Sequence, residues 1–234
     1  MGRVAGVDGV PGGWAVVLDD SGRRSVEKIE SFKKMFDGAT PFDLVAVDIP
    51  IGLLEAFEAG GRCCDRAARM LLRARRNSVF SAPVRPVLAA VSYPDACDRS
   101  RKSAPTGKAI SRQSFAICGK IAEVDHLLRT RPDLRDIVRE VHPEICFVEM
   151  TGSPMPHSKR KRTGRDARRE TLRARFTDID ALIEQGRRQG LPEQDVLDAA
   201  VACWSALRLA DGKGRSLIEP IPRDSFGLPM TIWV

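Results

Sequence analysis

The residues best placed to do chemistry are five carboxylates that follow or face predicted elements of a sheet. They are Asp8, Asp48, Glu144, Asp195 and Asp198. Asp8 and Asp48 each end an apolar run, and a carboxylate at the end of a buried strand lies at the edge of the sheet, where ligands usually bind. Glu144 follows a third run, and a structural surface acid is an equally good interpretation of it.

Carboxylates brought together in this way need either protons or a cation. Two of them about 4 Å apart repel by roughly 1 kcal/mol in bulk water and by about 4 kcal/mol at an effective dielectric of 20. Oxygen-only ligands suit Mg²⁺ or Mn²⁺ rather than Zn²⁺. The sequence therefore predicts a metal site formed by Asp8, Asp48, Asp198 and Glu144, with Asp195 as a further catalytic carboxylate. The alternative is that these side chains cap turns and helix ends.

The strands expected to carry Asp8 and Asp48 belong to one predicted mixed sheet. They are predicted at residues 4–8, 14–18, 25–29, 43–50 and 137–141. The first three are joined by short turns and predict an antiparallel meander. The fourth is reached by a crossover, so we expect it to lie parallel to the first, which sets Asp8 beside Asp48. The fold class is therefore α/β, with helices flanking a mixed five-stranded sheet.

Residues 191–207 predict the clearest helix in the chain, because proline and acids suit its first turn. Asp195 and Asp198 are three residues apart and share one face. Small side chains continue that side at Ala199, Ala202 and Ser205, so the helix can approach a sheet closely. Capping explains Asp195 but not Asp198, which lies inside an apolar segment and is a poor helix former there.

Two basic segments are candidates for binding an anionic substrate. Residues 61–76 predict a helix with five arginines on one face, and residues 159–175 hold nine basic side chains. The predicted phosphate contacts are Arg62, Arg66, Arg69, Arg73, Lys159 and Arg162. The alternative interpretation of both segments is a solvated surface.

The composition limits the classes of protein to which the chain can belong. Hydrophobic content of 43% and charged content of 29% are those of a globular protein. The net charge of +7 favours an anionic partner, but basic composition alone is weak evidence that this partner is nucleic acid. No apolar run is long enough for a membrane span. The six cysteines show neither metal-ligand nor disulfide spacing, and no leader precedes the first strand, so we expect a cytoplasmic protein. Protein partners and oligomeric state stay open.

Here the motifs resemble a known family. A meander whose first strand carries an aspartate, a parallel strand with a second one, and a late helix reading D-x-x-D-A-A are similar to the ribonuclease H-like superfamily, in particular its Holliday-junction resolvases. The segments VAGVDGVPGGW, AVDIPIGL, CDRAAR, SVFSAPVRPVL, SRQSFAI, VHPEICF and DVLDAAVACWSAL more closely resemble domain-of-unknown-function family four-two-nine, described as predicted ribonuclease H-like nucleases.

This resemblance implies one ribonuclease H-like domain over residues 1–234, with a loop-rich or helical insertion at about 53–110. It assigns the catalytic positions to Asp8, Asp48, Asp195 and Asp198, with Glu144 as an extra ligand. The chain departs from ribonuclease H in lacking a suitable acid on the first helix, because Asp37 lies at its far end. A resolvase-like arrangement is therefore the better comparison.

The predicted function is cleavage of nucleic-acid phosphodiesters by a nuclease with two Mg²⁺ or Mn²⁺ ions, because such ions activate water and stabilise the leaving oxygen. The substrate could be DNA, RNA, a branched junction or a small nucleotide. The alternative is a non-catalytic protein that keeps the fold and binds nucleic acid or another anion. An ATP phosphotransferase of the same superfamily would need two copies of the fold, and a cysteine hydrolase finds no support in the spacing.

Overall fold

A computed structural model describes residues 2–38 and 40–234. These residues form two compact units, and the chain passes from one to the other more than once. The first unit contains the chain up to Ile49, Asp136–Arg215 and Trp233–Val234, and the second contains Pro50–Arg135 and Ser216–Ile232. The second unit takes in more of the chain than an insertion at about 53–110, and the single ribonuclease H-like domain stays a prediction.

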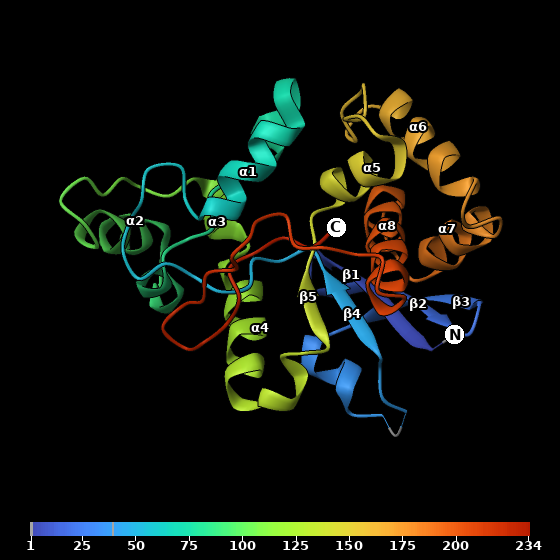
Figure 1. The fold of residues 1–234 in the computed structure, drawn as a ribbon, viewed down its shortest axis with the longest axis horizontal. Helices are drawn as coiled ribbons and strands as arrows, with labels where there is room; N and C mark the ends of the chain where they lie inside the picture. The colour runs from blue at the N-terminus through green and yellow to red at the C-terminus, as the bar shows by residue number, and fades with distance from the viewer. Residues whose placement is uncertain (1, 39) are drawn as a thin grey trace. The chain divides into compact units, whose positions relative to one another are not determined.

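The first unit is built on a mixed sheet (Figure 1), whose described strands are β1 (Arg3–Val10), β2 (Gly13–Asp20), β3 (Arg23–Ile29), β4 (Leu44–Val47) and β5 (Val138–Glu140). Their order is β3-β2-β1-β4-β5. The pairs β1–β2 and β2–β3 are antiparallel, whereas β1–β4 and β4–β5 are parallel. The predicted α/β class and mixed five-stranded sheet are confirmed for the described residues.

Strand β1 extends further than its apolar run predicted. It continues past Asp8 to Val10 and pairs with β2 along its whole length. Gly12 makes the tight turn possible, since its φ of 72° is one that side chains rarely adopt. Asp8 therefore lies inside β1, but at the level where the parallel partner β4 has just ended.

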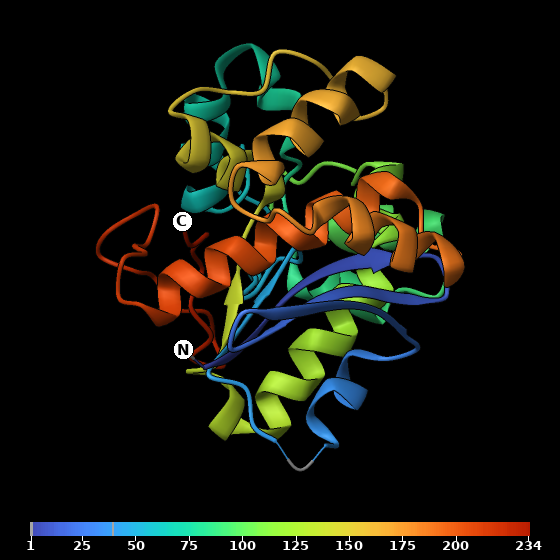
Figure 2. The same ribbon diagram turned by 90° about the vertical axis from the view of Figure 1, so that its right-hand side faces the viewer.

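Helices cover the sheet of the first unit, together with the short 3₁₀-helix η1 (Phe32–Phe36). They are α5 (Pro143–Thr151), α6 (Arg162–Arg173), α7 (Ile179–Arg188) and α8 (Glu193–Ala210). Figures 1 and 2 show α8 lying against the strands, with the other helices beside it. The sequence pattern predicts α8 but not α5 or α7. In the region of α6 it indicates only part of a basic segment.

Gly6 explains how closely α8 approaches the sheet. A Cβ atom at Gly6 would lie 2.0 Å from the backbone nitrogen of Cys203 and 2.1 Å from the carbonyl oxygen of Ala199. Ala199 and Ala202 are fully buried at this contact face. The small side chains predicted to let the helix approach closely do so, and the helix backbone lies directly on β1.

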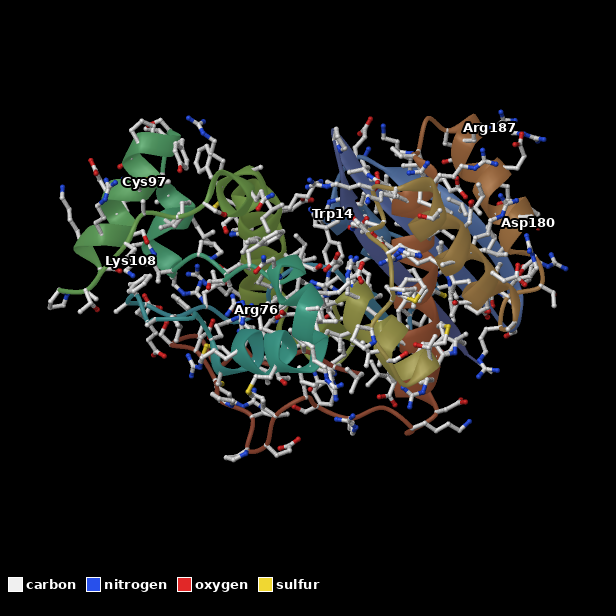
Figure 3. The ribbon with its side chains drawn as sticks, turned by 90° about the horizontal axis from the view of Figure 1, so that it is seen from above. Trp14, Arg76, Cys97, Lys108, Asp180 and Arg187 are labelled. Carbon is white, nitrogen blue, oxygen red and sulfur yellow. The ribbon has the colours of Figure 1, made fainter. Side chains whose placement is uncertain are left out.

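The second unit is mainly helical and contains short 3₁₀-helices. Its described elements are α1 (Cys63–Leu72), η2 (Arg73–Ser78), η3 (Arg85–Ala89), α2 (Tyr93–Lys102), α3 (Arg112–Ala116), α4 (Cys118–Thr130) and η4 (Pro132–Leu134). Four prolines in residues 77–108 predict an irregular chain there, which is wrong for α2, a helix capped by Ser92. Figure 3 labels Cys97 on α2 and Lys108 after it. The helical periodicity of residues 111–128 predicts one helix, but these residues form two, α3 and α4.

The mostly apolar residues 230–234 predict a terminal strand, which is wrong, because the C-terminal segment forms no strand within the described residues. Its backbone makes separate hydrogen bonds instead: Arg215 N–H donates to Val234 at 2.8 Å, and Trp233 N–H donates to Glu140 of β5 at 2.8 Å. No helix among residues 2–38 and 40–234 is both long and apolar enough to cross a membrane.

Candidate carboxylate site

Asp8 and Asp48 lie side by side at the carboxyl end of the parallel strands. Val7 pairs with Val47, so the next residues, Asp8 and Asp48, occupy the same level of the sheet. The N–H of Asp48 donates to the carbonyl oxygen of Val7 at 2.9 Å and fixes this register. Because neighbouring strands are about 4.8 Å apart, the two carboxylates start from adjacent backbone positions. The predicted pairing of these two aspartates is therefore present.

Helix α8 adds Asp198 to this pair. Asp8 lies two residues from Gly6 in β1, so both face the same side of the sheet, which is the side where α8 lies. The helix contacts Gly6 through Ala199, next to Asp198. Asp198 is 1% exposed, and Asp8 is 8% exposed. The geometry therefore buries two aspartates from different elements against each other.

Burial and mutual repulsion shift the pKa values of these carboxylates. Burial raises the pKa of Asp8 well above its usual value, and the charges of Asp198, Asp48 and Asp195 raise it further. Burial also raises the pKa of Asp48, with a contribution from Asp198. For Asp195 the cause is again burial, followed by Asp198. Each ionised group resists the ionisation of the others, which is the pattern typical of a ligand site for a cation.

Lys159 provides a positive charge within this cluster. It precedes α6, and its ammonium donates a hydrogen bond to Oδ2 of Asp198. Burial lowers the pKa of Lys159, but the charges of Asp198, Asp8 and Asp48 outweigh burial and raise it overall. The other oxygen of Asp198, Oδ1, is buried and has no hydrogen-bond partner among the residues that the structure describes. One carboxylate is thus only half satisfied.

Glu144 lies in the first turn of α5, immediately after β5, and its charge raises the pKa of Asp48. Its Oε1 accepts a hydrogen bond of 2.6 Å from Nη2 of Arg168, and both side chains are buried. His142, at the N-terminal boundary of the same helix, lowers the pKa of Asp48, although burial of Asp48 raises it overall. Glu144 is therefore near the cluster but is engaged by an arginine.

The side chains of the carboxylate site are of the chemical type that binds a hard divalent cation, but they do not form a complete set of metal ligands. Within residues 2–38 and 40–234, no group of three or more His, Cys, Asp or Glu side chains is positioned to hold a metal ion. The oxygen-only donors of Asp8, Asp48 and Asp198, and the orphaned Oδ1 of Asp198, match what Mg²⁺ or Mn²⁺ binds. The sequence predicted Lys159 only as a phosphate contact, and no spacing links it to Asp198, 39 residues away.

Two of the arginines predicted to contact phosphate, Arg62 and Arg69, instead form hydrogen bonds inside the second unit. Arg62 is 2% exposed; it donates to Asp65 at 2.7 Å and to the carbonyl oxygen of Ile51 at 2.8 Å. Arg69 donates to the carbonyl oxygen of Val79 at 2.9 Å. The guanidinium of Arg62 is therefore not on an exposed face, contrary to the sequence interpretation.

The predicted stripe of five arginines is also interrupted. Helix α1 ends at Leu72 because Arg73 adopts a φ of 49°, a backbone conformation that does not continue an α-helix. The prediction of one helix over residues 61–76 is therefore wrong. Arg66 and Arg73 are exposed, as is Arg76, which Figure 3 labels. In the first unit, the side chain of Arg162 is 88% exposed at the start of α6. All four side chains are exposed, and two of them already form ion pairs: Arg66 with Glu58 at 3.7 Å and Arg162 with Asp166 at 3.7 Å.

Together, the sheet, α8 and the converging aspartates define an α/β protein with a buried carboxylate site at the edge of its sheet. The chain belongs to the family described as Protein of unknown function (DUF429), which matches residues 6–223. The matched region includes every carboxylate of the site. Neither a curated protein nor a solved structure matches the chain.

Proposed function

We propose that this protein is a nuclease of ribonuclease H-like fold that cleaves phosphodiester bonds with Mg²⁺ or Mn²⁺. The observation that carries the proposal is that the buried side chains of Asp8 and Asp198 and the half-buried side chain of Asp48 interact through their charges, with Oδ1 of Asp198 lacking a hydrogen-bond partner among the described residues. The superfamily assignment is supported by the order of the sheet, with its antiparallel meander followed by parallel strands. The position of α8 over β1 also supports it.

In this proposal Asp8, Asp48 and Asp198 hold the cation. When bound, it supplies charge that lowers the pKa of water and neutralises oxygens of the phosphate. The protein's own part is orientation: β1, β4 and α8 are packed elements that fix the three carboxylates before substrate arrives. Asp195 lies one turn earlier on α8 and is half-buried, so it can accept a hydrogen bond from a water molecule at the site.

The proposed partner is nucleic acid. Exposed arginines suit phosphates because the guanidinium is planar and always charged. In the second unit Arg66 and Arg73 are candidates, and in the first unit Arg162 is a candidate. We also propose a cytoplasmic setting, which is supported by the six cysteines being free thiols.

Mn²⁺ titration calorimetry tests the metal site directly. We expect binding to the wild-type protein, and at least tenfold weaker binding to Asp8→Asn and Asp198→Asn. Asp180→Asn is the matched control, because Asp180 is an exposed aspartate of α7 (Figure 3). Wild-type protein that binds no Mn²⁺, or variants that bind it as tightly as the wild type, would contradict the proposal.

Cleavage assays then test the reaction and its substrate. Labelled single-stranded DNA, duplex DNA, a four-way junction and RNA would be incubated with Mn²⁺ and protein. We expect at least one to be cut, with the rate falling more than a hundredfold in Asp8→Asn. Binding should weaken steeply with salt if arginines contact phosphates, and Arg73→Gln should reduce that slope.

A second candidate function is a non-catalytic protein that binds nucleic acid. One observation favours it: Lys159 already forms an ion pair with Asp198, and no cation cage is preformed among the described residues. This candidate predicts salt-dependent binding of nucleic acid, no cleavage with any divalent cation, and no effect of Asp8→Asn on affinity.

A further inference from the structure

We propose that Lys159 is an internal cation that competes with the divalent ion for Asp198, and that Glu144 and Arg168 are positioning residues that hold Lys159 in place. This inference rests on the proposed function, because it assumes that the carboxylate site binds a divalent cation. It assigns Glu144 a role different from that of a metal ligand.

The competition follows from the contacts of Lys159. Its ammonium is hydrogen-bonded to Oδ2 of Asp198, and its charge interacts with those of Asp8 and Asp48. The free Oδ1 belongs to the same carboxylate, so a divalent cation bound there would lie close to the ammonium, and the two positive charges would repel each other. The side chain of Lys159 is 38% exposed, so it has a route to solvent, whereas that of Asp198 is 1% exposed and must stay. Lysine is therefore the partner that can leave.

The backbone before Lys159 is held by a buried arginine from α6. Arg168 donates to the carbonyl oxygen of His157 at 2.9 Å. It also donates to Oε1 of Glu144 at 2.6 Å, and so links α5, α6 and the segment that carries Lys159. This chain of contacts runs from Glu144 to the backbone of His157, two residues before Lys159. Because its partners are fixed, the segment presents Lys159 at one place.

Gly164 tightens the same segment. A Cβ atom at Gly164 would lie 2.0 Å from the carbonyl oxygen of Ser158, so only glycine permits this approach. That carbonyl also accepts a hydrogen bond of 3.0 Å from the N–H of Lys161. Lys159 therefore lies between backbone groups that are packed and hydrogen-bonded on both sides. Its side chain can move while its backbone stays in position.

The Glu144–Arg168 pair is better explained by positioning than by stability. Burying two charges costs solvation free energy, and well-packed apolar residues often replace such a pair without loss. Here the pair is 4% and 1% exposed, and Nε of Arg168 has no hydrogen-bond partner among the described residues. The pair connects the start of α5, which lies next to the carboxylate site, to the backbone just before Lys159.

The experiment measures Mn²⁺ affinity without substrate, by calorimetry, in wild-type protein and Lys159→Gln. Removing the competing ammonium should tighten Mn²⁺ binding at least tenfold. Lys161→Gln is the matched control, because it removes the same charge from an exposed side chain two residues away. That control should bind Mn²⁺ like the wild type, which excludes a general effect of net charge.

The outcomes separate this inference from the proposed function. If neither the wild type nor Lys159→Gln binds Mn²⁺, the proposed function fails. If both bind it equally while Asp198→Asn does not, the function stands and the competition is overturned. Weaker binding by Lys159→Gln would also overturn it, since Lys159 would then support the site. Binding by both proteins, with Lys159→Gln binding at least tenfold more tightly, would support both the proposed function and the competition.

Glu144→Gln tests the positioning role. If Glu144 holds Lys159 through Arg168, the variant should tighten Mn²⁺ binding, and adding it to Lys159→Gln should change nothing further. A metal ligand would instead give weaker binding in both backgrounds, and a purely structural residue would leave the affinity unchanged. If Glu144→Gln does not fold, Arg168→Lys keeps the charge but loses the forked contact, and the same comparison applies.

Discussion

The second unit surrounds one arginine with carboxylates, whereas the first unit surrounds one lysine with them. Arg85 donates to Glu55 at 3.0 Å and to Asp125 at 2.7 Å, and it also forms a hydrogen bond with Asp224. The two oxygens of Asp224 accept further hydrogen bonds from the backbone N–H groups of Leu53, Phe226 and Leu228. The guanidinium and the backbone thus satisfy the carboxylate of Asp224 completely.

The carboxylate site of the first unit is different. The ammonium of Lys159 bonds to one oxygen of Asp198, while Oδ1 of Asp198 has no hydrogen-bond partner in the described part of the chain. Burial raises the pKa of Asp8, with Asp198 adding to the effect. The contrast teaches that buried charge alone does not mark a functional site. A cluster whose hydrogen bonds are complete supports the fold, and one left incomplete has capacity for a ligand.

The largest effect should come from breaking the Arg85 cluster, which consists of Arg85 with Glu55, Asp125 and Asp224. Arg85→Met leaves Asp224 and Asp125 without their main cation, so we expect the free energy of unfolding to fall by about 3–5 kcal/mol. Urea unfolding measures this change. Arg101→Met removes an exposed arginine of α2 that pairs with Asp98, and it should cost far less. If Arg85→Met costs no more than this control, the Arg85 cluster is not structural.

The second-largest effect should come from the contact between Gly6 and α8, which positions the carboxylate site. Gly6→Ala would push a Cβ atom into the backbone of α8, so we expect a loss of about 1–3 kcal/mol and weaker Mn²⁺ binding. Gly119→Ala, in α4 of the second unit, is the control. A Cβ there meets nothing within 4 Å, and it should stabilise the protein by a few tenths to about 1 kcal/mol. Equal effects of the two substitutions would contradict the close packing of α8.

Removing the charge of Asp8 from the carboxylate site should stabilise the metal-free protein. The folded-state pKa of Asp8 is raised above 3.8, so the folded protein binds more protons than the unfolded chain between the two pKa values. The free energy of unfolding therefore falls as the pH rises through that range. Asp8→Asn removes this penalty, and we expect a gain of about 0.5–2 kcal/mol at pH 7 that disappears below the ordinary pKa.

Urea unfolding at pH 7 and pH 3.5 in the presence of a chelator checks the Asp8→Asn prediction. Asp180→Asn is again a suitable control because Asp180 is exposed on α7. An Asp8→Asn protein that is less stable than the wild type at pH 7 would show that the carboxylate of Asp8 is satisfied in the folded protein. The contrast between the two clusters would then be lost.

The smallest effect is expected at the surface. Arg173 forms ion pairs with Glu170 and Asp180 on the exposed side of α6 and α7, and the ends of α7 are labelled in Figure 3. Water and salt screen such pairs, so Arg173→Gln should leave the melting temperature unchanged within error. A clear drop in melting temperature would show that surface ion pairs matter as much as the buried clusters.

The sheet and part of the site could be predicted because their signals are local. The apolar runs that end near Asp8 and Asp48 are typical of buried strands, and their parallel pairing follows from the crossover between them. Helix α8 has clear boundary residues, and its small side chains predict the close approach that Gly6 makes possible. These features need no knowledge of distant contacts.

Other features depend on contacts or conformations that leave no local signal. Pro94 suggested irregular chain, yet it lies in the first turn of α2, where proline needs no N–H partner. The helical pattern of residues 61–76 gave no warning of the left-handed Arg73. The pairing of Lys159 with Asp198 and the burial of Arg168 depend on tertiary packing, which basic composition alone does not indicate.

The late return of the chain to both units constrains how the protein can be made. Asp224, which completes the Arg85 cluster, comes from Ser216–Ile232, and Trp233 then bonds to Glu140 on the edge strand β5. During synthesis Arg85 therefore emerges 139 residues before Asp224, and β5 keeps an open edge until Trp233 has been made. Each unit therefore lacks its last contacts until the end of the chain has been synthesised. A ribosome that stalls before residue 216 leaves two unfinished units, and both are exposed to aggregation.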